Sequence, residues 1–92
     1  MEILKSDDGR HGKFFVEQGD EELAQMTFTW AGKDRIIIDH TEVGDELRGK
    51  GAGKQLVMKA VEFARSEGIK IIPLCPFAKS VFDKVSEIRD VL

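Results

Sequence analysis

The chain has 92 residues, of which 41% are hydrophobic, and this is enough for one core but not for two. We therefore expect residues 1–92 to form a single domain. There are 17 acidic and 14 basic residues, and no basic tract lies outside one short glycine-rich segment, which argues against a nucleic-acid partner. The single cysteine excludes an internal disulfide, and no apolar stretch approaches the ~20 residues that span a bilayer or resembles a secretory leader. The expectation is a cytoplasmic protein without a membrane partner.

Alternating hydrophobic residues in the first half predict an antiparallel meander of three strands. Residues 1–12 show no periodicity and are interpreted as a mobile lead-in, although residues 3–4 are compatible with the start of an edge strand. Strands are predicted at residues 14–17 and 24–30. A third strand, residues 35–43, contains three consecutive isoleucines, which is typical of a strand covered on both faces.

The second half changes to a helical period. Apolar residues from Ala52 onward recur on one face of a predicted helix, and Gly68 fits the residue that caps its end. Residues 69–72 then predict a buried strand, which a crossover helix would bring parallel to the third strand. A second, shorter helix is expected to begin at Pro76. The predicted fold class is therefore α+β, with a mixed sheet, a βαβ crossover and a C-terminal helix.

The segment Leu47 to Lys54 carries three glycines at alternating positions and three basic residues just before and within the start of the predicted helix. Glycines let backbone N–H groups approach a ligand, and the positive end of the helix dipole favours an anion at the same point. The segment therefore predicts a phosphate-binding loop. The alternative is a solvated glycine-rich turn with ordinary surface lysines.

Two better-known phosphate motifs do not fit this segment. A Walker A loop beginning at Gly44 would require Ser or Thr where the chain has Gly51, so its magnesium ligand is absent. A dinucleotide-binding fingerprint would require a glycine where the chain has Lys54, and no later βαβ unit supplies the acidic residue that binds ribose. Both nucleotide-binding interpretations are therefore disfavoured.

The residues from Arg48 to Gly53 resemble the acetyl-CoA-binding signature of the GNAT superfamily of N-acetyltransferases, which reads Gln or Arg, two residues, Gly, one residue, then Gly or Ala. Residues 40–43 before the loop and residues 73–77 after the following strand resemble those of a short, single-domain GNAT-like subfamily with a Pro-x-Cys-Pro segment. The resemblance covers roughly residues 12–85. It implies a GNAT-like mixed sheet, acetyl-CoA as the cofactor, and transfer of an acetyl group to an amine acceptor.

The resemblance also implies which residues hold acetyl-CoA. Backbone amides of the loop would bind the pyrophosphate, and pantetheine would lie beside the end of the third strand. The cofactor-binding residues expected on this basis are Thr41, Glu42, Val43, Arg48, Gly49, Lys50, Gly51, Ala52, Gly53 and Lys54.

Transfer to an amine needs a deprotonated amine, a polarised carbonyl and a proton donor for the departing thiolate. His40 and Glu42 are two residues apart on the third strand, so without a bulge they share a face near the loop. They are candidate catalytic residues. The alternatives are a histidine that bonds a neighbouring backbone group and a solvated surface carboxylate.

Cys75 immediately precedes the helix that begins at Pro76, and a thiolate at a helix N-terminus is stabilised. It also follows a strand end, where open α/β sheets bind ligands. Cys75 is therefore a third catalytic candidate: a nucleophile that takes the acetyl group, a general acid or base, or a thiol that forms a mixed disulfide with CoA. The alternative is a small buried hydrophobic residue.

Larger members of the resembled superfamily have two helices after the first strand and further strands at the C-terminus, and these form much of the acceptor site. This chain has the tight turn Gly19-Asp20 at the first position and nothing comparable after its second helix. Three functions therefore remain open: a small acetyltransferase acting on an unidentified amine, a CoA- or acyl-CoA-binding module without turnover, and a structural interaction domain. A monomer or a weak homodimer is expected, and no metal site is.

Overall fold

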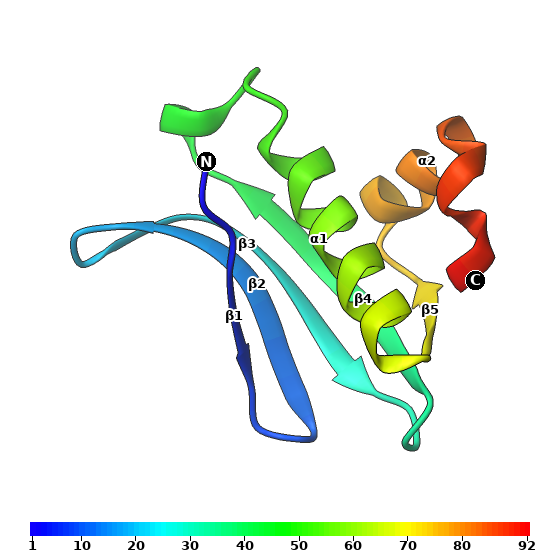
Figure 1. Cartoon of the computed structure of the whole chain (residues 1–92). Coiled ribbons are helices and arrows are strands. Elements are labelled where there is room, and N and C mark those ends of the chain that lie inside the picture. Colours follow the sequence, from blue (N-terminus) through cyan, green and yellow to red (C-terminus); the bar gives the residue numbers. More distant parts are fainter.

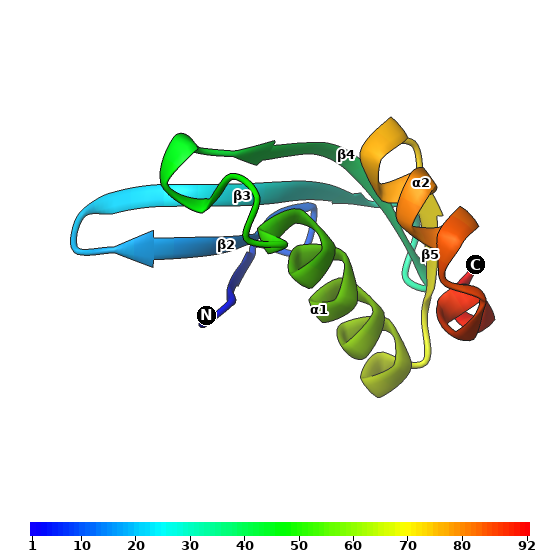
Figure 2. The same ribbon diagram turned by 90° about the horizontal axis from the view of Figure 1, so that it is seen from above.

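The computed structural model describes all 92 residues and contains one mixed sheet with helices on one face (Figures 1 and 2). The strands are β1 (Leu4–Asp7), β2 (His11–Gln18), β3 (Glu21–Trp30), β4 (Arg35–Val43) and β5 (Lys70–Pro73). The helices are α1 (Ala52–Glu67) and α2 (Pro76–Lys84), with short 3₁₀ turns at η1 (Asp45–Leu47) and η2 (Ser86–Val91). The strands lie in sequence order, the first four antiparallel and β5 parallel to β4. This confirms the predicted α+β class and the βαβ crossover.

The lead-in predicted at the N-terminus is wrong in part, because residues 4–7 form the edge strand β1. Leu4 pairs with Phe15 of β2, so the antiparallel meander has four strands instead of three. The reversal between β1 and β2 is held by two carboxylates: Asp7 accepts the N–H of Gly9, and Asp8 accepts the N–H of His11. Asp-Asp-Gly is a recognisable turn sequence, because short acidic side chains bond the backbone that follows them. The sequence contained this signal.

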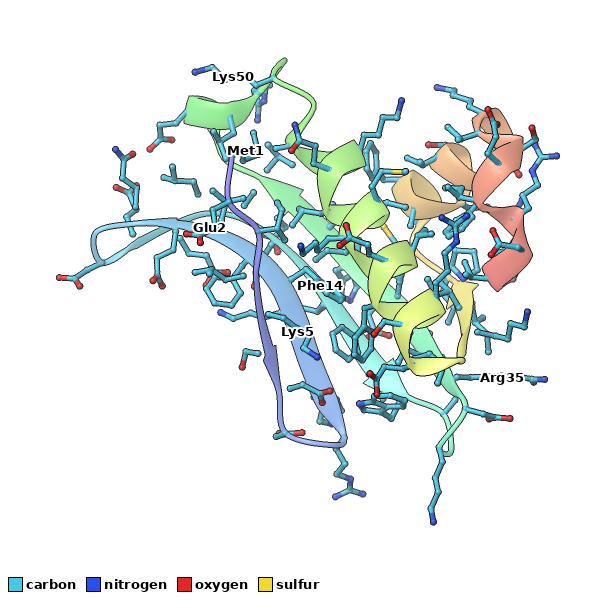
Figure 3. The ribbon with its side chains drawn as sticks, viewed as in Figure 1. Met1, Glu2, Lys5, Phe14, Arg35 and Lys50 are labelled. Carbon is cyan, nitrogen blue, oxygen red and sulfur yellow. The ribbon has the colours of Figure 1, made fainter.

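The core lies between the sheet and the helices. Phe14 is 1% exposed and packs its ring against Phe28 and Phe63, with centroids 5.3 and 5.9 Å away. Figure 3 shows Phe14 between the sheet and α1. The Nζ of Lys5 lies 3.9 Å from the centroid of the Phe63 ring, a cation–π contact that ties β1 to α1. Neither α1 nor α2 combines the length and apolar content of a membrane-crossing helix.

A bulge in β4 decides which side chains face the helices. Thr27 of β3 pairs with His40, whereas the next residue, Phe28, pairs with Ile38, so Asp39 has no partner opposite it. Asp39 is held there by Thr29, whose hydroxyl donates to the Asp39 carboxylate at 2.7 Å. An extra residue in one strand reverses the alternation of side chains beyond it.

The consequence is a change of face halfway along β4. Ile38 is buried against the helices, and beyond the bulge Thr41 and Val43 lie on that side. His40 and Glu42 are exposed. They do share a face, as the sequence predicted, but the register beyond the bulge turns that face away from α1, which covers the other side of the sheet (Figure 2).

Candidate functional site

The segment after η1 forms an open loop that leads into α1. Gly49 and Gly51 have φ angles of +80° and +75°, a left-handed conformation that other residues rarely adopt. Gly51 is also the residue that precedes the first turn of α1, and no side chain caps the helix there. Local backbone geometry therefore requires glycine at both positions.

The first turn of α1 presents unpaired hydrogen-bond donors. The first N–H of the helix with a partner belongs to Gln55, which donates to the Gly51 carbonyl at 3.1 Å. The N–H groups of Ala52, Gly53 and Lys54 make no hydrogen bond within the protein. Such groups at a helix N-terminus are ready donors to an anion, and the helix dipole adds a positive potential.

The basic side chains of the loop contribute unequally. Arg48 lies 3.2 Å from the carboxylate of Asp45, so part of its charge is already neutralised. Lys50 is at the tip of the loop and extends outward into solvent (Figure 3). Lys54 is exposed and has no acidic partner within ion-pair distance. The backbone is therefore the more fixed element of this loop, and the side chains are the more mobile one.

A groove of about 400 Å³ runs from this loop to the end of β4. Its walls come from β4, from the loop and first turn of α1, and from the start of α2. The lining residues are Thr41, Val43, Leu47, Arg48, Gly49, Gly51, Ala52, Gly53, Lys54 and Phe77. The groove thus joins most of the residues expected to bind the cofactor, while Glu42 and Lys50 do not line it.

Phe77 is a wall residue that no motif in the sequence indicates. A Cβ on Gly53 would come within 2.6 Å of the Phe77 ring, so the ring lies directly on the backbone of α1. The side chain is 42% exposed in spite of its size. A large apolar residue beside the proline that begins a helix was the available signal, but the contact with Gly53 depends on how α2 packs against α1.

Cys75 is 5% exposed and does not itself line the groove. The last paired residues of β4 and β5 are Ile38 and Pro73; beyond them the Cys75 N–H donates to the Ile38 carbonyl at 3.0 Å. The Cys75 Sγ is 3.3 Å from the Thr41 hydroxyl oxygen. Thus Cys75, 34 residues from Thr41 in the sequence, meets the side chain that lines the groove.

The thiol has several hydrogen-bond donors around it. Burial raises the pKa of Cys75, but hydrogen bonds from the Thr41 side chain and from the backbone N–H groups of Ala78, Phe77 and Thr41 outweigh it. The net result is a pKa below the ordinary value, because these donors stabilise the thiolate. The N-terminus of α2 therefore acts on Cys75 in the direction that the sequence predicted.

The structure does not bring the three catalytic candidates together. Thr41 lines the groove and contacts Cys75, whereas His40 and Glu42 are exposed on the other face of β4. Glu42 lines a separate hollow of about 280 Å³ with Glu22 and Gln25. No three His, Cys, Asp or Glu side chains gather where they could share a metal ion.

Comparison with known sequences assigns the chain to a family. A profile described as GCN5-related N-acetyl-transferase matches residues 13–91, and the chain therefore belongs to this acetyltransferase family. Protein NATD1 of Xenopus tropicalis is 32% identical over 69 residues, which are 74% of this chain and 63% of that protein. Human Protein NATD1 is 33% identical over 69 residues, 74% and 61% of the two chains. The chain spans about three fifths of the length of these relatives.

Solved structures agree with this assignment. The NMR structure of a GCN5-like protein from Staphylococcus aureus has a TM-score of 0.77 and 38% identity, covering 98% of this chain and 85% of that one. The crystal structure of ribosomal-protein-alanine N-acetyltransferase from Brucella melitensis biovar Abortus 2308 has a TM-score of 0.69 and 17% identity, with coverage of 85% and 62%. At that identity the likeness shows the fold alone. The GNAT resemblance of the sequence is confirmed.

Proposed function

We propose that this protein is an acetyl-CoA-dependent N-acetyltransferase that acts on an amine acceptor in the cytoplasm. One observation carries the proposal: the unpaired N–H groups of α1 open into the same groove that reaches Thr41, the contact of Cys75. A single continuous groove thus offers donors for a diphosphate at one end and, at the other, the Thr41 side chain that contacts the Cys75 thiol. Membership of the family supports the same chemistry.

The residues present fit acetyl-CoA. The space around Gly49 and Gly51 is open, because a Cβ built on either residue would have no atom within 4 Å. The approach to the free N–H groups is therefore unobstructed. The positive φ at both residues still disfavours a side chain there. Those N–H groups would hold the pyrophosphate. The apolar side chains of Val43, Leu47 and Phe77 would then cover the pantetheine arm between the loop and Thr41.

When bound, acetyl-CoA supplies an activated acetyl thioester. The lowered pKa of Cys75 favours its thiolate, and this is the form that attacks a thioester carbon. If the acetyl group passes through Cys75, the Cys75 thiolate would attack the thioester carbon and CoA would leave as its thiolate. The amine would then attack acetyl-Cys75 and lose a proton to solvent or to a base, and the Cys75 thiolate would leave. If transfer is direct, Cys75 instead gives its proton to the departing thiolate.

His40 and Glu42 can serve only an amine that approaches from the uncovered face of the sheet. On that face they would accept the proton that the amine loses. Both side chains are exposed and so are accessible to an acceptor. Cys75, however, contacts Thr41 on the other face of β4, so the strand lies between these two side chains and the thiol. This separation favours one second function: a CoA- or acyl-CoA-binding module without turnover.

A backbone-amide NMR titration with acetyl-CoA tests the proposal, with ATP as a phosphate-bearing control. We expect saturable shifts at residues 48–54 and 41–43 with acetyl-CoA and weak ones with ATP. Titration at two protein concentrations also reports whether the chain is a monomer or a weak dimer. If neither ligand moves the loop, the proposal is wrong.

Turnover is tested separately with a panel of amines, by following release of the CoA thiol and the mass of the acceptor. Cys75→Ser keeps the size of the side chain and removes the thiol. An acetyl group found on the wild-type protein but not on Cys75→Ser would support transfer through Cys75. Acetyl-CoA binding with no amine acetylated would favour the binding module.

A further inference from the structure

The extra residue of β4 is anchored from the face of the sheet that the helices leave uncovered (Figure 2). Asp39 has no partner opposite it in β3, but its carboxylate accepts the hydroxyl of Thr29 at 2.7 Å. The Thr29 oxygen also lies 3.3 Å from Nδ1 of His11, its partner in β2. Because the hydroxyl hydrogen is given to Asp39, the oxygen is left to accept from His11. Side chains of three neighbouring strands thus hold one bulge.

The bond between Thr29 and Asp39 has a counterpart at the thiol. Only two side chain–side chain hydrogen bonds of the protein are part-buried, Thr29–Asp39 and Thr41–Cys75, and all the others are exposed. Both are made by β4, through residues two apart. A hydrogen bond that water reaches less easily holds its geometry better. Neither Thr29 nor Asp39 lines the groove.

The backbone connects Asp39 directly to Cys75. The Ile38 carbonyl, which accepts the Cys75 N–H at 3.0 Å, belongs to the same planar peptide unit as the N–H and Cα of Asp39. The direction of that carbonyl therefore depends on where the Asp39 Cα lies. Two residues further along β4, the Thr41 hydroxyl oxygen is 3.3 Å from the Cys75 Sγ. A shift of the bulge would therefore disturb the position of Thr41 relative to Cys75.

Packing fixes the strand on either side of the bulge, but it does not fix the bulge itself. Ile38 is fully buried, and Val43 packs against the core. An extra residue in a strand is left out of the ladder of paired residues. Asp39 is such a residue, and the bond from Thr29 is the one side-chain hydrogen bond that it makes. This bond therefore decides how the strand passes from Ile38 to Thr41.

We propose that Thr29 is a positioning residue for the thiol: through Asp39 it fixes the bulge of β4, and the bulge holds Thr41 against Cys75. Thr29 acts from the uncovered side of the sheet, away from the groove that Thr41 lines. The importance of this positioning for acetyl transfer rests on the proposed function. The positioning itself is measured in the free protein, so the two can fail separately.

The test follows iodoacetamide labelling of Cys75 against pH, without ligand, in wild type and three variants. Thr29→Val removes the hydroxyl but keeps the shape of the side chain. The Thr41 donor should then loosen from the thiol, so the labelling midpoint should move to higher pH. Thr29→Ser keeps the hydroxyl and should match wild type. Thr27 lies two residues away on β3, opposite His40, so Thr27→Val is the matched control and should also match wild type.

A double variant separates positioning from a general effect on the sheet. Thr41→Val removes the side-chain contact with Cys75 itself, so the midpoint of Thr29→Val should move no further than that of Thr41→Val. In the double variant Thr29→Val/Thr41→Val the shift should be smaller than the sum of the two single shifts, because two residues that act through one contact are not additive.

Three results would overturn the positioning role of Thr29. They are an unmoved midpoint in Thr29→Val, an equal shift in Thr27→Val, and a double-variant shift equal to the sum of the single shifts. Circular dichroism shows which variants fold; if Thr29→Val does not, Thr29→Ala removes the same hydroxyl and takes its place. If wild type does not bind acetyl-CoA, the proposed function is wrong, and the labelling profiles still decide the role of Thr29.

Discussion

Backbone recognition of the diphosphate makes a specific prediction about the loop: Gly51→Val should weaken acetyl-CoA binding more than Lys54→Ala. Gly51 has φ +75°, and a residue with a side chain pays about 1–2 kcal/mol there, more when it is β-branched. No atom lies within 4 Å of the added Cβ. The substitution therefore changes the loop backbone without disturbing the core.

The expected size of the effect follows from the donors that Gly51 positions. The N–H groups of the next three residues are free, and a hydrogen bond to a charged group contributes about 1.5–3 kcal/mol. Loss of one such bond weakens binding roughly 10- to 150-fold. Lys54 is an exposed charge, and its removal should cost about 0.2–1 kcal/mol, a factor of about 5 at most.

Calorimetric titration with acetyl-CoA measures both variants, with circular dichroism to verify folding. Gly9→Val is the matched control, because Gly9 has φ +90° and equally open space around its Cβ, but lies in the β1–β2 turn away from the groove. It should bind like wild type. A loss in Lys54→Ala equal to or greater than that in Gly51→Val would refute backbone recognition.

Three further predictions concern the thiol, the core and the C-terminal segment. Thr41→Val removes a hydrogen bond to Cys75, so the pKa of the thiol should rise and the midpoint of its iodoacetamide labelling profile should move to higher pH; an unmoved midpoint contradicts the assigned role of Thr41. Phe14→Ala should lower the free energy of unfolding in urea by about 3–5 kcal/mol, because a fully buried ring leaves a cavity; a loss below about 1 kcal/mol would mean that the core closes over it. The hydrogen bond from Arg65 lowers the pKa of Asp90 in the folded protein. This bond therefore stabilises the fold fully at pH values above the ordinary Asp pKa near 3.8, and the stabilisation is lost as pH falls through the lower native pKa. Thermal midpoints of wild type and Asp90→Asn should therefore differ at neutral pH and converge in acid.

Much of the fold could be predicted because its signals are local. The apolar stripe that begins at Ala52 and the glycine that ends it are confirmed as α1, since Gly68 caps that helix in a left-handed conformation. Pro76 begins α2, and the strand between the two helices pairs parallel to β4. Helical period, capping residues and proline each act within a few residues. The edge strand β1 was missed because its own four residues carry little pattern and its pairing with β2 gives it order.

The candidate site likewise has one part that local sequence predicts and another that depends on contacts between distant residues. The glycine loop that leads into α1 could be predicted from residues 48–53, because glycine spacing and the following helix are contiguous in sequence. The contacts of Cys75 and Phe77 could not, since the first depends on Thr41, 34 residues away, and the second on Gly53. These distances are set by how α2 packs on the sheet and on α1.

The position of His40 and Glu42 shows most clearly what only the tertiary structure decided. Strand alternation alone would continue the buried face of Ile38 to His40 and Glu42. The unpaired Asp39 reverses it, and Thr41 enters the groove instead. The sequence by itself determined a strand, a glycine loop and two helices, because each depends on neighbouring residues. Which side of β4 faces the thiol depends on the register with β3, and register is a property of two hydrogen-bonded segments that no single stretch of sequence contains.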